Sequence, residues 1–160
     1  MILTCTACGA SGIVKRFQRI TPFCWKHYLQ MRRHGRTLAR TKFDPNEFID
    51  HGEFVEIILY QGNGEVEAVA STFVDRSQWP GVRQHKWHVA KRAKGGTKYA
   101  ESIIDGRNTL LHHFIVGKRD GLEVDHVDGN GLNNRKNNLQ FLTHRENVQK
   151  YFVSRRTHSI

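Results

Sequence analysis

The sequence predicts an α+β protein with a small N-terminal zinc finger, a small antiparallel sheet and a C-terminal unit of two strands and a helix. Three observations predict this class. Close cysteine and histidine pairs lie near the N-terminus, β-branched and aromatic runs flank glycine-containing turns in the middle, and a helix-capping pattern follows two short apolar runs near the C-terminus. We expect three regions: residues 1–42, a linker and small β region over 43–85, and residues 86–160 with a hairpin ahead of the final unit.

The three cysteines of the chain form two close pairs with one histidine, Cys5-x-x-Cys8 and Cys24-x-x-His27. Together they supply the four ligands that a closed tetrahedral zinc site requires. The alternative is buried cysteines and a surface histidine without a metal, which the spacing disfavours. Because a region of 42 residues builds little core, the zinc would be structural.

A helix is predicted around the second pair. Thr21 and Pro22 suit its N-cap and first position, and Gly35 suits its C-terminal stop. The segment FCWKHYLQMRRHG resembles a short zinc-finger module found at the front of phage-encoded nucleases. Its basic side chains, including Arg32 and Arg33, would then form a phosphate-binding surface.

The formal charge of +10 is unevenly distributed. Residues 1–42 carry +9 and residues 83–160 carry +8, whereas residues 43–82 carry −7. Basic regions on both sides of an acidic one favour a polyanionic partner, because phosphate contacts supply affinity that does not depend on base sequence. A merely soluble basic protein, or one drawn to an anionic membrane, is the alternative.

The middle of the chain predicts two pairs of strands. Residues 54–60 and 66–74 are separated by the turn signal Gly-Asn-Gly, and residues 87–91 and 99–104 are joined around Gly-Gly. The aromatic side chains Phe73, Trp79 and Trp87 are expected in the core rather than stacked on bases. The tip of the second hairpin carries cations that would contact DNA or form a solvated turn, namely Lys91, Arg92 and Lys94.

The C-terminal unit brings a carboxylate, an imidazole and two carboxamides together. Residues 122–124 and 139–142 are the predicted strands, and a capping box, Thr-x-x-Glu, starts the last helix at residue 143. The polar groups are those of Asp125, His126, Asn138 and Asn147. Oxygen ligands hold hard divalent cations, and histidine accepts a proton from water near neutral pH. This set suits hydrolysis of a phosphodiester.

The run V-D-H-x-D-G-N-x-L-N-N-R-x-x-N-L, followed by T-x-x-E-N, resembles the HNH nucleases, and specifically the phage and intron homing endonucleases. The resemblance covers residues 86–151 and implies a ββα-metal fold. It implies that Asp125 and Asn147 bind one Mg²⁺ or Mn²⁺, that His126 deprotonates the attacking water, and that Asn138 orients the imidazole. The last family position is often His, and the carboxamide found here favours a hard cation over zinc.

Further residues of this unit have weaker signals. Residues 108–116 predict a short helix with Asn108 as N-cap, and His112 within it is a packing residue or a phosphate contact. Arg135 is a candidate phosphate clamp. The remaining polar loop residues are expected to build turns, namely Asp128, Asn133, Asn134 and Asn137.

These features predict a site-specific endonuclease of the homing type that acts on double-stranded DNA as a monomer and nicks one strand. A restriction or phage-packaging nuclease with the same site, and a noncatalytic DNA-binding protein, are the alternatives. The sequence shows neither a membrane-spanning apolar run nor a signal-peptide pattern, so we expect the cytoplasm of a bacterial or phage-infected cell.

Overall fold

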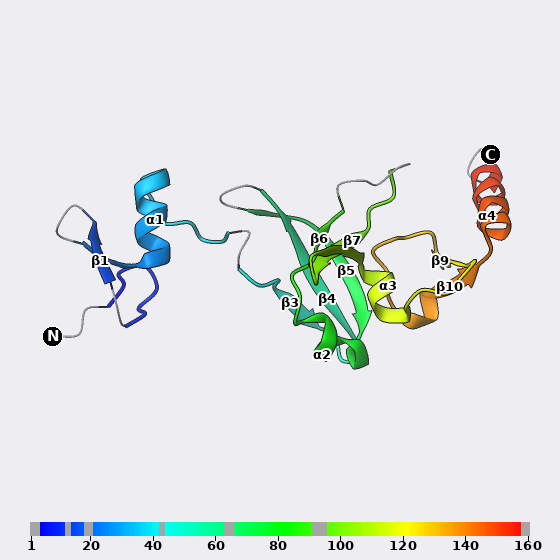
Figure 1. Ribbon diagram of the computed structural model, residues 1–160, viewed down its shortest axis with the longest axis horizontal. Helices are drawn as coiled ribbons and strands as arrows, with labels where there is room; N and C mark the ends of the chain where they lie inside the picture. The colour runs from blue at the N-terminus through cyan, green and yellow to red at the C-terminus, as the bar shows by residue number, and fades with distance from the viewer. Residues whose placement is uncertain are drawn as a thin grey trace. The chain divides into compact units, whose positions relative to one another are not determined.

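The computed structural model describes residues 4–11, 14–17, 21–41, 44–62, 66–90 and 96–157 (Figure 1). It divides the chain into two compact units, Met1–Phe43 with Gly62–Val66, and Asp44–Gln61 with Glu67–Ile160. Residues 44–61 and 67–85 therefore belong to the same unit as the C-terminal region. The mixed composition of helices and small antiparallel sheets confirms the predicted fold class.

The described residues of the first unit form a two-stranded antiparallel sheet and a helix. Strand β1 (Val14–Phe17) pairs with β2 (Thr21–Cys24), and helix α1 (Trp25–His34) follows at once. The prediction that Thr21 and Pro22 start the helix is wrong: both lie in β2, and Cys24 is the N-cap. A strand with a single partner tolerates the missing N–H of proline. The predicted stop is confirmed, because Gly35 takes φ 69° and its N–H binds Met31 O at 3.0 Å.

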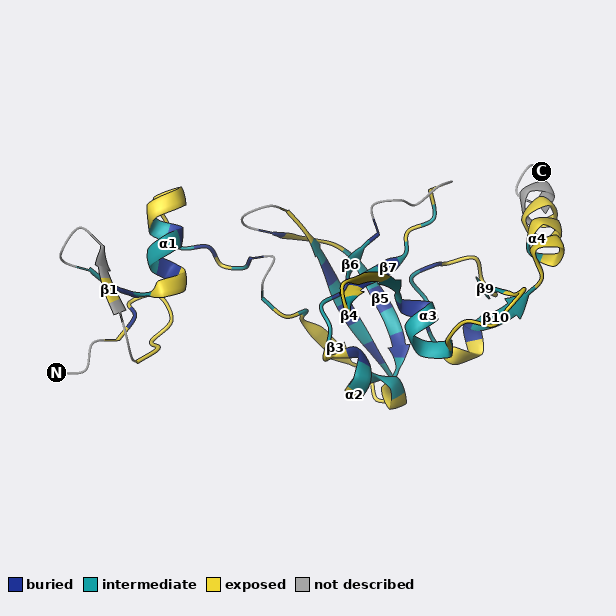
Figure 2. Cartoon of the chain, in the orientation of Figure 1, coloured by how far each residue is buried: buried dark blue, intermediate teal, exposed yellow. Residues whose placement is uncertain are grey.

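The core of the second unit lies on a three-stranded antiparallel sheet. Its strands are β3 (Phe48–Asp50), β4 (Phe54–Gln61) and β5 (Glu67–Asp75), with β4 in the centre. Buried and less buried residues alternate along β4 (Figure 2), as expected for a strand with one face in the core. The β4–β5 hairpin is confirmed, and the turn at residues 63–65 lies outside the described residues.

The sheet is followed by a short helix, a second sheet and another helix. A 3₁₀ turn η1 (Arg76–Gln78) and helix α2 (Trp79–Val82) lead to the antiparallel strands β6 (His88–Val89), β7 (Ala100–Ile104) and β8 (Arg107–Leu110). Helix α3 (Leu111–Val116) comes next. The prediction of Asn108 as its N-cap is wrong, because Asn108 pairs with Ile103 and extends the strand. Trp87, 1% exposed, lies in the core as predicted and binds Val82 O through its indole N–H at 2.8 Å.

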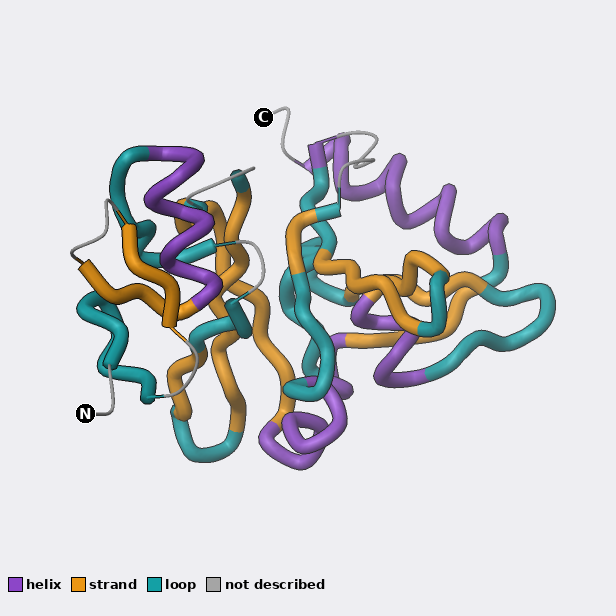
Figure 3. The backbone as a smooth tube through the Cα atoms, turned by 60° about the vertical axis from the view of Figure 1, so that its left-hand side comes forward, coloured by secondary structure: helices purple, strands orange, loops and turns teal. Residues whose placement is uncertain are grey.

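The C-terminal hairpin and helix have the predicted ββα order. Strand β9 (Glu123–His126) pairs with β10 (Leu139–Leu142) in antiparallel register, with the 3₁₀ turn η3 (Lys136–Asn138) before β10. Helix α4 (His144–Thr157) contacts both strands (Figure 3). The capping box is confirmed: Thr143 N–H binds Glu146 Oε2 at 2.8 Å, and Glu146 N–H binds Thr143 Oγ1 at 3.3 Å.

Candidate functional site

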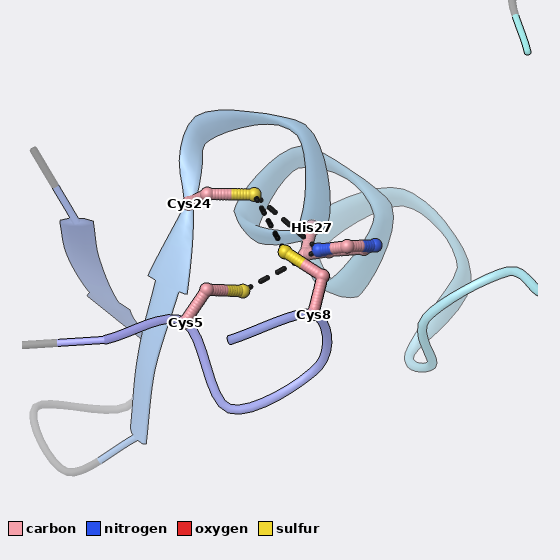
Figure 4. A group of neighbouring side chains, drawn as sticks. All are labelled: Cys5, Cys8, Cys24 and His27. Carbon is pink, nitrogen blue, oxygen red and sulfur yellow. Dashed lines mark hydrogen bonds between the residues drawn. The ribbon is translucent and has the colours of Figure 1, made fainter. Parts of the chain in front are cut away.

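The predicted zinc ligands converge in the first unit. The ligand atoms of Cys5, Cys8, Cys24 and His27 all lie within 4.8 Å of one another (Figure 4). His27 Nδ1 is 3.4 Å from the sulfur of Cys5 and 3.3 Å from that of Cys24, and the sulfurs of Cys8 and Cys24 are 4.0 Å apart. Tetrahedral zinc with bonds of about 2.3 Å to sulfur would place its ligand atoms roughly 3.8 Å apart. The four side chains therefore fit a metal ion at their centre.

The electrostatic environment of Cys5 favours a metal-binding thiolate. Burial opposes ionisation of this thiol, but hydrogen bonds from backbone groups of Cys24, Ala7 and Cys8 and from the ring of His27 outweigh it and lower its pKa to about 6. A thiolate is the form of cysteine that binds metals. The first pair thus contains a ligand that is ready to bind at neutral pH.

In the second unit, Asp125 lies where β9 meets α4. Lys150 of the helix donates to Asp125 Oδ2 at 2.6 Å and to His126 O at 2.5 Å. Gln140, the cross-strand partner of Asp125, donates to the same carboxylate oxygen at 2.7 Å. The carboxylate is therefore held from the strand and from the helix, and an ammonium group balances its charge.

Asn147 lies on the same side of α4 as Lys150, one turn earlier. Its Nδ2 donates to Glu123 Oε2 at 2.6 Å, and Glu123 stands two residues before Asp125 on the same face of β9. Among the described side chains of α4, residues 144–153, Asn147 and Lys150 are the less exposed ones. The bond to Glu123 fixes the amide orientation, so Oδ1 is the atom of Asn147 that can bind a cation.

The side chain of His126 projects to the other side of β9 and is buried, 4% exposed. Its Nε2 lies 3.2 Å from Asn134 Oδ1, and its ring is 5.1 Å from that of His112. Burial lowers the pKa of His126, although the hydrogen bond to Asn134 and the charge of Asp125 act in the opposite direction. The imidazole is therefore kept neutral at pH 7, as a proton acceptor must be.

Asn138 has a different partner from the one expected. Its Nδ2 donates to Asp128 Oδ1 at 2.9 Å and to Asn133 O at 2.8 Å, and its Oδ1 accepts from Asp128 N–H at 3.1 Å. The side chain that reaches the imidazole is that of Asn134. Asn138 thus closes the loop between β9 and β10, and Asp128 and Asn133 build the same loop as predicted.

This loop, residues 127–138, is attached to β5. Phe73 N–H binds Leu132 O at 2.9 Å, and Asn134 N–H binds Phe73 O at 2.8 Å. Arg135 pairs with Asp75 at 3.2 Å and packs over the ring of Phe54 at 5.1 Å, and its contact with a phosphate stays a prediction. The central sheet is therefore part of the framework that positions the loop between β9 and β10.

A cavity of about 540 Å³ adjoins this junction. Its lining includes Lys118, Arg119, Glu123 and Asn147. His112 also borders it and is 4% exposed. Burial, with the neighbouring rings of His113 and His126, lowers the pKa of His112 to about 3, so it is an uncharged packing residue rather than a cationic phosphate contact.

Only some of the predicted DNA contacts lie within the described residues. Arg32 and Arg33 are exposed in the last turn of α1. Three others lie outside the described residues, namely Lys91, Arg92 and Lys94. Within the described residues, no helix is both long and apolar enough to cross a lipid bilayer.

Residues 116–149 match the family model of the HNH endonuclease. This segment, called the HNH segment below, is similar to the HNH endonucleases. The chain is 32% identical over 103 residues to the DNA endonuclease I-HmuI of Bacillus phage SP01, a match that covers 61% of this chain and 56% of that protein. It is 36% identical over 81 residues to an uncharacterized HNH endonuclease of Acanthamoeba polyphaga mimivirus, covering 47% of this chain and 40% of that protein. The chain thus matches about half the length of these relatives, and no solved structure matches it significantly.

Several residues in and around the HNH segment are not predicted by the sequence. Lys150 could have been found, because it lies three positions after Asn147 and so shares its helical face. Glu123 could have been found from the alternation along β9. Thr72, which binds Asn134 from a distance of 62 residues in sequence, gives no local signal.

Proposed function

We propose that this protein is a site-specific DNA endonuclease of the homing type that hydrolyses phosphodiester bonds with one divalent metal ion and a histidine general base. The observation that carries the proposal is the arrangement of the HNH segment, in which Asp125 and His126 end β9 and Asn147 of α4 binds Glu123 on the Asp125 side of that strand. The similarity to the phage endonuclease I-HmuI supports DNA as the substrate.

Asp125 and Asn147 would hold Mg²⁺ or Mn²⁺ through oxygen. The donor set fits a hard cation, and two protein ligands leave positions for water and phosphate. When bound, the ion supplies charge stabilisation for the scissile phosphate and the leaving 3′ oxygen. Lys150 donates to Asp125 Oδ2. The cation would bind this oxygen either together with the ammonium group or in its place.

His126 would take a proton from the attacking water. The water oxygen then forms a bond to phosphorus while the bond from phosphorus to the 3′ oxygen breaks. The leaving oxygen gains a proton from solvent, and the products are a 5′-phosphate and a 3′-hydroxyl. Because burial lowers the pKa of His126, the imidazole is available as a base at neutral pH.

The first unit would serve binding rather than chemistry. Its Cys₃His cluster would hold a structural zinc ion, and the exposed Arg32 and Arg33 would contact phosphates. Near the catalytic junction, Lys118 and Arg119 border the cavity and would attract the DNA backbone. We place this activity in the cytoplasm, where reduced thiols remain available for zinc.

A randomised duplex library tests the proposal. The full chain, purified with zinc, is incubated with the library in the presence and absence of Mg²⁺, and the new DNA ends are sequenced. We expect Mg²⁺-dependent ends that carry a 5′-phosphate and a recurrent flanking sequence. A library that is bound but left uncut would instead indicate a noncatalytic DNA-binding protein.

The same substrate tests the mode of cutting. The chain contains one HNH motif, and one site with one metal cuts one strand per engagement. We propose a monomer that nicks, so supercoiled plasmid carrying the site should become open circular before it becomes linear. Direct appearance of linear product, with a rate that rises as the square of protein concentration, would show a dimer instead.

A further inference from the structure

A buried chain of hydrogen bonds connects the catalytic histidine to the central sheet. His126 Nε2 is 3.2 Å from Asn134 Oδ1, Asn134 Nδ2 is 2.8 Å from Thr72 Oγ1, and Thr72 Oγ1 is 2.7 Å from Leu132 O. Asn134 and Thr72 are each 0% exposed. The chain is therefore shielded from solvent, where each of its bonds is strong and each unpaired group is costly.

The directions of these bonds follow from the last acceptor. The carbonyl oxygen of Leu132 can only accept, so the hydroxyl of Thr72 donates its one hydrogen to it. Thr72 Oγ1 must then accept from Asn134, which requires the amide nitrogen of Asn134 to face Thr72. The amide oxygen consequently faces His126, and because it can only accept, the hydrogen of the neutral imidazole lies on Nε2.

This arrangement leaves the lone pair of the neutral imidazole on Nδ1. Free histidine exchanges between two tautomers, and only one of them presents the basic nitrogen in a given direction. The ring is also restrained by its neighbours, since its centroid is 5.1 Å from that of His112 and 5.9 Å from that of Tyr99. The hydrogen-bond chain selects the tautomer, and the packing limits rotation.

We propose that Thr72 and Asn134 are positioning residues that hold His126 in the Nε2–H tautomer with Nδ1 as the proton-accepting atom. The inference rests on the proposed nuclease function and assigns a role to a strand outside the HNH segment. It differs from a loop-building role, because Asn134 contacts the imidazole and β5, whereas Asp128, Asn133 and Asn138 bind one another within the loop.

The tautomer can be measured directly. In the full chain labelled with ¹⁵N-histidine and loaded with zinc, long-range ¹⁵N–¹H spectra at pH 8 distinguish a protonated from an unprotonated ring nitrogen, and a His126→Gln variant identifies the signal. We expect His126 to show a protonated Nε2 and an unprotonated Nδ1. In Thr72→Val each ring nitrogen of His126 should be protonated in only part of the molecules, because both tautomers are populated. Thr72→Ser, which keeps the hydroxyl, should restore the single tautomer.

Cleavage kinetics provide the second measurement. Asn134→Leu should lower kcat by about 10²-fold, near the lower end of the loss for a general base, with little change in KM because the chain is buried away from DNA. Thr72→Val should show a smaller loss that Thr72→Ser rescues. Val74→Ala is the control: it removes a fully buried core side chain from the same strand and should lower thermal stability without changing the tautomer.

The outcomes separate this inference from the proposed function. If the wild-type chain cuts DNA but His126 carries its hydrogen on Nδ1, or if Thr72→Val leaves both tautomer and kcat unchanged, the positioning role is wrong. If the tautomer is as expected but the chain does not cut DNA with Mg²⁺, the positioning geometry stands and the nuclease proposal fails.

Discussion

Replacing His112 by glutamine should make the second unit less sensitive to acid. His112 lies in α3, is 4% exposed, and contacts the rings of His113, Tyr99 and His126 at centroid distances of 4.4, 5.7 and 5.1 Å. Burial and the two neighbouring histidines lower its pKa to about 3. A neutral imidazole is tolerated in this environment, whereas a charged one is not.

The magnitude follows from proton linkage. The unfolded chain protonates this histidine below about pH 6.5, and the folded chain protonates it only near pH 3, so between these values the unfolded state binds more protons. The free energy of unfolding therefore carries no penalty from His112 at neutral pH and falls by about 1.4 kcal/mol for each pH unit below 6.5. At pH 4.5 the loss should reach about 2.7 kcal/mol.

Urea denaturation of the wild-type chain and of His112→Gln at pH 7.5 and pH 4.5 measures this loss. The variant starts from a different stability, so the two proteins are compared by how much their free energy of unfolding falls between pH 7.5 and pH 4.5. This fall should be about 2.7 kcal/mol smaller in the variant than in the wild type. His34→Gln, at an exposed position of α1, is the control and should follow the wild type. Equal pH dependence in wild type and His112→Gln would refute the argument.

Three further predictions concern metals, DNA and the loop. Asn147→Ala should weaken activation of cleavage by Mg²⁺ and retain zinc, whereas Cys24→Ser should lose zinc and weaken DNA binding. Elemental analysis measures the zinc content, and Mg²⁺ titration measures the activation. Loss of zinc in both variants would disprove two separate metal sites. Replacing Arg32 and Arg33 together by glutamine should reduce the slope of log binding constant against log salt by roughly one to two units, and an unchanged slope would exclude phosphate contacts. Gly131→Ala should destabilise the loop of residues 127–138 by about 1–3 kcal/mol, because the Cβ of the alanine would lie 2.5 Å from a backbone oxygen. Thermal unfolding measures this loss, and an unchanged Tm would show that the loop can move away.

The sequence predicts those features that depend on local chemistry. The capping box at residues 143–146, the stop of α1 at Gly35 and the alternation along β4 each rest on interactions within a few residues. The four ligands of the cysteine cluster were also evident, since their spacing brings both pairs to one centre. Such patterns are sufficient wherever the determining contacts are close in sequence.

The sequence did not predict features that depend on distant partners. Helix starts at Thr21 and Asn108 were wrong, because both residues pair with a neighbouring strand and tertiary pairing overrides a capping preference. The motif predicts that Asn138 orients the imidazole, whereas its side chain binds loop residues, and the motif gives no indication that Arg135 pairs with Asp75 of β5. A carboxamide or guanidinium has many possible partners, and spacing alone does not choose among them.

Cleavage and binding by His126→Ala, measured on the site recovered from the library, test whether His126 is the general base. We expect the wild-type chain to cut this DNA with Mg²⁺ and the variant to cut it about 10²–10⁴-fold more slowly while binding with nearly unchanged affinity. A variant that cuts as fast as the wild type, or one that loses binding and cleavage to the same extent, would contradict this role of His126.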